Sequence, residues 1–330
     1  MAMAAGKQIS VAPMMDVTDR HCRYFLRQIS PHVRLYTEMI TAQAILHGDQ
    51  ERLLAFDPVE HPLAVQLGGH DPVQLAAAAR IAAARGYDEI NLNVGCPSDR
   101  VRDGRFGACL MLDAERVARC VAAMAEAVHV PVTVKTRIGV DDQDSYEFLA
   151  AFVERVARAG CGTFIVHARK AILQGLSPRE NREVPPLLPE RVHRLKREFP
   201  ALRIIINGGI ASLERIDAEL ALLDGVMLGR KVAGDPSFLA AVEARFFASG
   251  DNHQAFDRDH VVRRMCEYAQ RQAGSGLRLH QVTRHMLGLY HGQPGARGWR
   301  RLLSEQAGRP GAQPQLLLES LDAMSMSNQA

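Results

Sequence analysis

The segment from Arg203 to Arg230 reads RIIINGGIASLERIDAELALLDGVMLGR. It holds two short apolar runs, Arg203 to Asn207 and Gly225 to Leu228, with a stretch of helical periodicity between them. Runs of this length predict buried strands. A helix that connects two such strands predicts that they lie parallel in one sheet.

The same unit recurs along the chain, which is 330 residues long. Eight apolar runs are each followed by a segment of helical period: Ile9 to Ala12, Leu35 to Thr37, Leu63 to Leu67, Glu89 to Val94, Val132 to Lys135, Thr163 to His167, Arg203 to Asn207 and Gly225 to Leu228. Eight strand-and-helix units within about 240 residues match a closed (β/α)8 TIM barrel. We therefore predict an α/β fold of this type.

A doubly wound open sheet is the alternative architecture. It is disfavoured because no Gly-x-Gly-x-x-Gly pattern follows the first strand, and because polar residues follow nearly every strand instead of gathering at one switch point. After Phe247 the pattern changes, and from Asp259 onward the chain reads as helical without strand candidates. The barrel is thus expected to precede a small C-terminal helical domain.

Composition and cysteine spacing exclude several classes of protein. Hydrophobic residues make up 47% and charged residues 23%, as in soluble globular proteins, which excludes disordered and fibrous chains. We expect no membrane span, because no apolar run reaches about 18 residues, and no secretory signal, so the expected compartment is the cytoplasm. The six cysteines form no Cys-x-x-Cys pair, so neither a structural metal nor a disulfide framework is expected.

Basic residues are concentrated near the C-terminus. The segment from Arg258 to Arg309 holds ten arginines against three acidic residues, a net charge of +7. Because the whole chain carries +3, the remainder carries −4. This asymmetry suggests an anionic partner for the helical domain, although a solvated helical surface would give the same count.

The residues after the last two strands suggest a phosphate site. The glycines at 208, 209 and 229 allow backbone N–H groups to approach an anion closely, and Arg230 adds further donors. In barrels the loops after strands seven and eight commonly bind phosphate. We therefore predict a ligand that carries a phosphate group.

Three other strand ends carry reactive side chains. Cys96 lies between Gly95 and Pro97 in a loop at the predicted mouth, where a thiol can act as a general acid or, once deprotonated, as a nucleophile. Lys135 ends the fifth strand and would place positive charge over the cavity, where it could stabilise a reduced flavin. His167 ends the sixth strand and could donate to a phosphate or a ring.

Together these motifs resemble those of the tRNA-dihydrouridine synthases, and the match is close to the A subfamily. The resemblance covers residues 8 to 305 and rests on VAPMMD at 11–16, NLNVGCPSDRV at 91–101, GACLM at 107–111, KTRIG at 135–139, HARK at 167–170, LSPRENRE at 176–183, NGGI at 207–210 and GVMLGR at 225–230.

The resemblance implies an FMN-binding catalytic barrel over residues 1–248 and a helical tRNA-binding domain over residues 254–330. The implied reaction is reduction of the C5=C6 bond of uridine to 5,6-dihydrouridine at positions 20 and 20a of the tRNA D-loop. Hydride would pass from flavin N5 to C6, Cys96 would be the catalytic acid that protonates C5, and NADPH or NADH would reduce the flavin again. No metal and no obligate protein partner is implied.

The resemblance also assigns roles to residues at the mouth and in the helical domain. The residues implied to bind FMN are Pro13, Met14, Met15, Gln66, Lys135, His167, Asn207, Gly208, Gly209, Gly229 and Arg230. The residues implied to contact the flipped uridine or nearby tRNA are Asn93, Arg137, Arg179, Arg182, Arg297 and Arg300.

Two other functions compete with this reading. An FMN-dependent dehydrogenase of the same fold could act on a free pyrimidine, but the arginine-rich domain would then have no purpose. A catalytically idle barrel could bind and remodel tRNA, but the presence of both Cys96 and Lys135 speaks against it.

Overall fold

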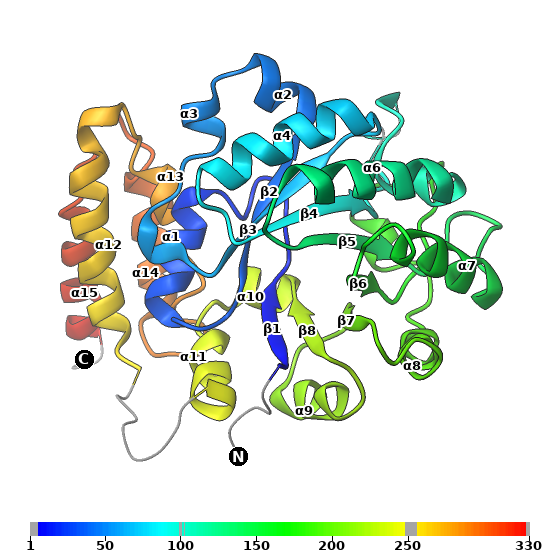
Figure 1. Ribbon diagram of the computed structural model, residues 1–330. Coiled ribbons are helices and arrows are strands. Elements are labelled where there is room, and N and C mark those ends of the chain that lie inside the picture. Colours follow the sequence, from blue (N-terminus) through cyan, green and yellow to red (C-terminus); the bar gives the residue numbers. More distant parts are fainter. Residues whose placement is uncertain (1–5, 99–100, 102, 248–255, 328–330) are drawn as a thin grey trace. The chain divides into compact units, whose positions relative to one another are not determined.

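The computed structural model describes residues 6–98, 101, 103–247 and 256–327 (Figure 1). The chain divides into two compact units that alternate along the sequence. The barrel unit contains residues 6–16 and Arg34–Gly229, and the helical unit contains Val17–Val33 and the described residues from Arg230 onward.

The barrel unit is built on eight parallel strands. They are β1 (Gln8–Val11), β2 (Leu35–Thr41), β3 (Leu63–Gly68), β4 (Glu89–Val94), β5 (Val132–Arg137), β6 (Thr163–His167), β7 (Arg203–Asn207) and β8 (Gly225–Leu228). Neighbours pair in the order β1-β8-β7-β6-β5-β4-β3-β2. The ring closes where the main chain of Arg34, just before β2, exchanges hydrogen bonds with Ile9 and Val11 of β1. The prediction of a (β/α)8 barrel is therefore confirmed.

One strand differs clearly from its predicted length. The sequence predicts a strand from Leu35 to Thr37, whereas β2 continues to Thr41 with a shift of register between Tyr36 and Met39. A shift of this kind places two successive residues on one face, so the regular alternation that marks a strand in the sequence is lost. This is why the second half of β2 was missed.

In the described part of the barrel unit, α-helices surround the strands (Figure 1). They are α2 (Ala42–His47), α3 (Gln50–Leu53), α4 (Pro72–Ala84), α6 (Ala114–Ala127), α7 (Tyr146–Ala157), α8 (Pro189–Glu198) and α9 (Leu213–Leu222). The predicted start of α4 is confirmed, because Asp71 accepts a hydrogen bond from the Gln74 N–H and Pro72 is the first helical residue. Ser145 caps α7 in the same way.

The interior of the barrel is apolar on one side and polar on the other. The apolar side is formed by Ile165, Ile205 and Met227 of β6 to β8, which belong to one packed cluster with Ala12, Tyr36 and Ala64. On the other side β3, β4 and β5 contribute the buried polar residues Gln66, Glu89, Asn91, Asn93 and Thr133. Every one of these polar side chains has a hydrogen-bond partner, as burial requires.

The helical unit is formed by α1 (Arg20–Ile29), α10 (Arg230–Gly234), α11 (Phe238–Val242), α12 (Arg258–Gln272), α13 (His280–Thr283), α14 (Ala296–Gln306) and α15 (Leu316–Ser327). Within it, α1 packs against α12 through the stacked rings of Tyr24 and Tyr268. The single tryptophan, Trp299, is fully buried and donates to the Met286 carbonyl, which anchors α14.

The boundary predicted between residues 248 and 254 lies outside the described residues, so the division into a catalytic and a tRNA-binding domain stays a prediction. None of the helices in the described part of the chain combines the length and the apolar character needed to cross a bilayer.

Candidate active site at the mouth of the barrel

Strand register brings the predicted residues of β4 to β7 into two adjoining rows. Asn93 pairs with Lys135, Arg137 pairs with His167, and His167 pairs with Asn207. Because all the strands are parallel, these positions share the carboxyl-end mouth, where barrel enzymes build their sites.

Lys135 reaches across the barrel from β5 to β7. Its ammonium group donates to Oδ1 of Asn207 at 3.1 Å, and Asn207 in turn donates to the Met227 carbonyl at 2.9 Å. Among the described residues the ammonium group pairs with this amide and with no carboxylate. Burial lowers the pKa of Lys135 to about 7, with repulsion by Arg137 as a smaller cause. The mouth therefore holds an amine whose protonated form an anionic ligand would stabilise.

The Cys96 loop is held by main-chain hydrogen bonds on both sides. Oδ1 of Asn93 accepts from the N–H groups of Gly95 (3.1 Å) and Cys96 (3.0 Å), and the Cys96 carbonyl accepts from Ala108 (2.9 Å). Gly107 has a φ of +74°, and a Cβ there would lie 2.5 Å from the Cys96 carbonyl oxygen. Only glycine allows this close approach. The half-buried thiol of Cys96 is thus fixed in place, 3.4 Å from the Ser98 hydroxyl.

Arg137 connects the Cys96 loop to the loop that follows β6. Its Nε donates to the Gly95 carbonyl, and its Nη1 donates to the carbonyls of Lys170 and Asn181. The side chain is only 4% exposed, and this burial lowers its pKa to about 10. Arg137 was predicted to contact the nucleotide; in this arrangement Nη2 is the part of the guanidinium group left for that contact.

The loop after β6 carries the predicted arginines Arg179 and Arg182. Both are exposed, and Arg179 lies 3.8 Å from Glu183. The buried amide of Asn181 exchanges hydrogen bonds with the main chain of Ile172, which holds the loop in shape. These two arginines are therefore presented to solvent from a rigid base.

The main chain of the predicted phosphate loop adopts a conformation that favours glycine at two successive positions. Gly208 and Gly209 have φ values of +108° and +72°. A Cβ at Gly208 would lie 2.7 Å from Cδ2 of His167, and one at Gly209 would lie 2.5 Å from Leu187, so neither position has room for a side chain. Gly229 follows β8, and Arg230 is the first residue of α10, in the helical unit.

The loop after β1 supplies the remaining predicted cofactor residues. Met14 packs against the apolar cluster inside the barrel, and Met15 is 51% exposed. Pro13 is half-buried just after β1. The amide of Gln66 is buried and hydrogen-bonded to Asn93.

The arginines of the helical unit fall into two groups. Several serve the fold: Arg271 donates to the Tyr24 hydroxyl, and Arg284 pairs with Asp19. Burial raises the pKa of Asp19, but its hydrogen bonds and charge interactions with His285, Cys22 and Arg284 together lower that pKa well below its usual range. In the other group, within the described residues, Arg263, Arg297, Arg300 and Arg301 are exposed and make no ion pair.

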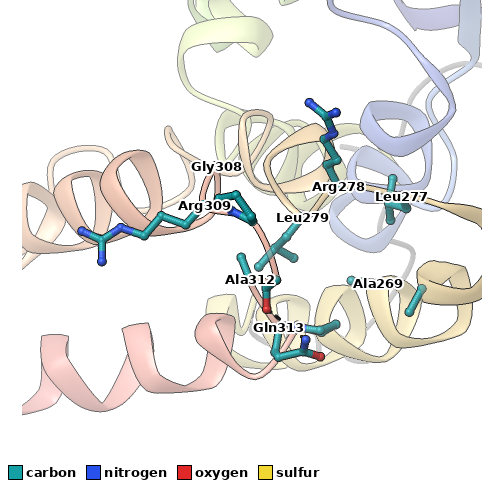
Figure 2. Close-up of a pocket in the computed structure, with 12 residues that line it drawn as sticks. Ala269, Leu277, Arg278, Leu279, Gly308, Arg309, Ala312 and Gln313 are labelled. Carbon is teal, nitrogen blue, oxygen red and sulfur yellow. Dashed lines mark hydrogen bonds between the residues drawn. The ribbon is translucent and has the colours of Figure 1, made fainter.

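A separate cavity of about 440 Å³ lies inside the helical unit (Figure 2). Its walls are mostly small or apolar residues such as Ala269, Leu279 and Ala312, and the guanidinium groups of Arg278 and Arg309 extend away from it. None of the residues predicted for catalysis or for cofactor binding lines this cavity. It therefore belongs to the packing of the helices and not to the mouth of the barrel.

Four buried residues that support the mouth from below were not predicted as site residues: Tyr36, Glu89, Asn91 and Thr133. Their signal in the sequence is polar residues at alternate positions of strands that otherwise read as fully buried, namely 89, 91 and 93 in β4 and 133, 135 and 137 in β5. Among the described residues, no group of histidine, cysteine and acidic side chains could hold a metal ion.

The fold and the mouth define a (β/α)8-barrel enzyme with a buried cation beside a held thiol. A sequence model of dihydrouridine synthases matches residues 10–325. A tRNA-dihydrouridine(20/20a) synthase of Escherichia coli strain K12 is 58% identical over 315 residues, 95% of this chain and 90% of that protein. Proteins of the same name from Shewanella oneidensis and Xanthomonas axonopodis pv. citri are 56% and 54% identical, over 93% and 97% of this chain and 90% and 94% of their own lengths. The chain belongs to the dihydrouridine synthase family.

The lowered pKa of Lys135 predicts a specific pH dependence of stability. Between pH 7 and pH 10.5 the unfolded chain binds a proton that the folded, ligand-free protein does not, so the contribution of Lys135 to stability rises with pH in this window. From pH 7 to pH 9 the free energy of unfolding of the wild type should increase by at most about 2 kcal/mol relative to that of Lys135→Met. Urea unfolding of both ligand-free proteins at the two pH values measures this gain. An unchanged difference between the two proteins would show that the pKa of Lys135 is not lowered.

Proposed function

We propose that this protein is an FMN-dependent enzyme of the cytoplasm that reduces uridine to 5,6-dihydrouridine at positions 20 and 20a of tRNA, with NADPH or NADH as the reductant. The single observation that carries the proposal is a thiol fixed beside a buried lysine at the barrel mouth. It occurs in a chain that is 54–58% identical to proteins named for this reaction.

The residues at the mouth fit an anionic, phosphate-bearing cofactor. Lys135 has an amide and no carboxylate as its described partner, so its charge is not neutralised by the protein. Gly208 and Gly209 carry no side chains and both have positive φ, so their main chain can be approached closely by a phosphate group. We assign the isoalloxazine ring to Pro13, Met14, Met15, Gln66 and Lys135. The ribityl and phosphate groups are assigned to His167, Asn207, Gly208, Gly209, Gly229 and Arg230.

When bound, FMN would supply the hydride that C6 of the uracil ring accepts. NADPH or NADH would then reduce the FMN again. Cys96 donates its proton to C5, which prevents negative charge from building up on the ring. A negative charge on Cys96 raises the pKa values of Lys135 and Arg137, so the protonated forms of both side chains are favoured once the proton has been transferred. The mouth thus favours the charge distribution that follows proton transfer.

Recognition of tRNA is assigned to two sets of side chains. At the mouth, Asn93, Arg137, Arg179 and Arg182 would contact the flipped uridine and its neighbours. In the helical unit, the exposed Arg297 and Arg300 would bind tRNA phosphates. Extruding a base costs a few kcal/mol, and binding of the phosphate backbone by these arginines would offset that cost.

The experiment that tests the proposal compares two substrates. An unmodified tRNA transcript incubated with the protein and NADPH should gain two mass units at position 20 or 20a, located by nuclease digestion and mass spectrometry. Free uridine should remain unreduced, because it lacks the phosphates that the arginines bind. Reduction of free uridine at a similar rate, with or without tRNA, would instead identify the protein as a dehydrogenase of free pyrimidines.

The exposed arginines of α14 predict a second result. Arg297→Ala and Arg300→Ala should each weaken tRNA binding by about 1 kcal/mol and lower the slope of log Kd against log salt by about 1, because each removes one phosphate contact. NADPH oxidation without tRNA should not change. Arg264→Ala is the matched control, since Arg264 already pairs with Glu267 at 2.8 Å. Salt slopes equal to that of the control would exclude a docking role for α14.

A further inference from the structure

A continuous chain of hydrogen bonds crosses the polar side of the barrel, from the first residue of β4 to the mouth. The Thr133 hydroxyl donates to Oε1 of Glu89 (2.6 Å), Asn91 Nδ2 donates to Thr133 (2.8 Å), Gln66 Nε2 donates to Asn91 Oδ1 (2.8 Å), and Asn93 Nδ2 donates to Gln66 Oε1 (2.7 Å). All five side chains are at most 9% exposed. We call these residues the amide chain.

The direction of the amide chain is set at both of its ends. At the mouth, Oδ1 of Asn93 faces the N–H groups of Gly95 and Cys96, which can only donate. The NH2 group of Asn93 must then face an acceptor, which is Oε1 of Gln66. The NH2 group of Gln66 must in turn face an acceptor, which is Oδ1 of Asn91. At the other end, the Glu89 carboxylate can only accept. Turning any one amide over would bring donor against donor, at a cost of about 1–3 kcal/mol.

Glu89 is itself held firmly. Its Oε1 also accepts from the Tyr36 hydroxyl at 2.7 Å, and its Oε2 accepts from Arg34 at 3.1 Å. A buried carboxylate is costly unless it is paired and hydrogen-bonded, and apolar residues would fill the same space at lower cost. The opposite side of this barrel is filled in that way, by Ile165, Ile205 and Met227. The polar side therefore calls for an explanation other than packing.

The mouth end of the amide chain supplies that explanation. The oxygen of Asn93 is the acceptor that fixes the main chain of Gly95 and Cys96, so the position of the thiol depends on the orientation of this amide. We propose that Glu89, acting through Thr133, Asn91 and Gln66, is a positioning residue that orients Asn93 and thereby holds the Cys96 thiol in place for proton transfer. The identity of the reaction in this inference rests on the proposed function. The positioning of the thiol rests only on the hydrogen bonds described above.

The test breaks the amide chain at Thr133 without changing the size of the side chain. Thr133→Val removes the hydroxyl, so Asn91 loses its acceptor and Glu89 loses a donor. Thr136→Val is the matched control: Thr136 lies three residues further along β5, is equally buried, and donates only to the main-chain carbonyls of Val94 and Arg137. Thr133→Ser restores the hydroxyl and should restore both properties measured below.

Two properties of the FMN-loaded protein are measured. The first is the rate at which iodoacetamide alkylates Cys96, followed by peptide mass spectrometry. This rate should rise at least threefold in Thr133→Val, because the contacts of Asn93 with the loop are weakened. The second is the single-turnover rate of tRNA reduction by the pre-reduced protein, which should fall about tenfold. Because Gln66 belongs both to the amide chain and to the assigned FMN site, the FMN content of each variant is measured and both rates are expressed per bound FMN.

Each outcome gives a definite answer. If Thr133→Val and Thr136→Val show equal alkylation rates, the proposal is wrong, whatever the activity. If the wild type fails to reduce tRNA but the alkylation rates differ as expected, the proposed function fails and the positioning of the thiol stands. If Thr133→Val does not fold, Glu89→Gln serves instead: it keeps the size of the side chain, allows an NH2 group to face Thr133, and should change both properties in the same direction.

Discussion

The register between neighbouring strands is the constraint on which the mouth of this barrel depends. Successive side chains of a strand point to opposite faces, so a slip of one residue would exchange the interior and exterior sets. The pairing of Asn93 with Lys135 and of His167 with Asn207 therefore determines which side chains meet at the mouth. The polar row from Gln66 through Asn91 to Thr133 depends on the same register.

Among the described residues, the two basic side chains at the mouth have neutral partners and no carboxylate. Lys135 and Arg137 are desolvated cations held by neutral oxygens: an amide for Lys135, and three carbonyls for Arg137. Such an arrangement stabilises the protein poorly by itself, as the lowered pKa of Lys135 indicates. It becomes favourable when an anionic group lies nearby, whether that group is a cofactor or the Cys96 thiolate.

Much of the fold could be predicted because its signals are local. The limits of six of the eight strands match within one residue, and the start of α4 follows from the two consecutive residues Asp71 and Pro72. The strand ends of a parallel barrel must share one mouth, so the location of the site also followed from topology. The partners of each side chain did not: that Arg137 would donate to main-chain carbonyls, or that Thr133 would bridge Glu89 and Asn91, depends on contacts between strands that no local pattern encodes. In the helical unit, the count of arginines could not separate Arg284, which pairs with Asp19, from the exposed Arg297.

The central claim is that the Cys96 thiol gives the proton for reduction of a tRNA uridine at this mouth. The most direct measurement follows flavin absorbance after anaerobic mixing of pre-reduced protein with unmodified tRNA, for the wild type and for Cys96→Ala. Loss of the acid should slow flavin reoxidation by a factor of about 10² to 10⁴, with unchanged flavin reduction by NADPH. Equal rates of reoxidation in the two proteins would contradict the account, because another group would then have to supply the proton.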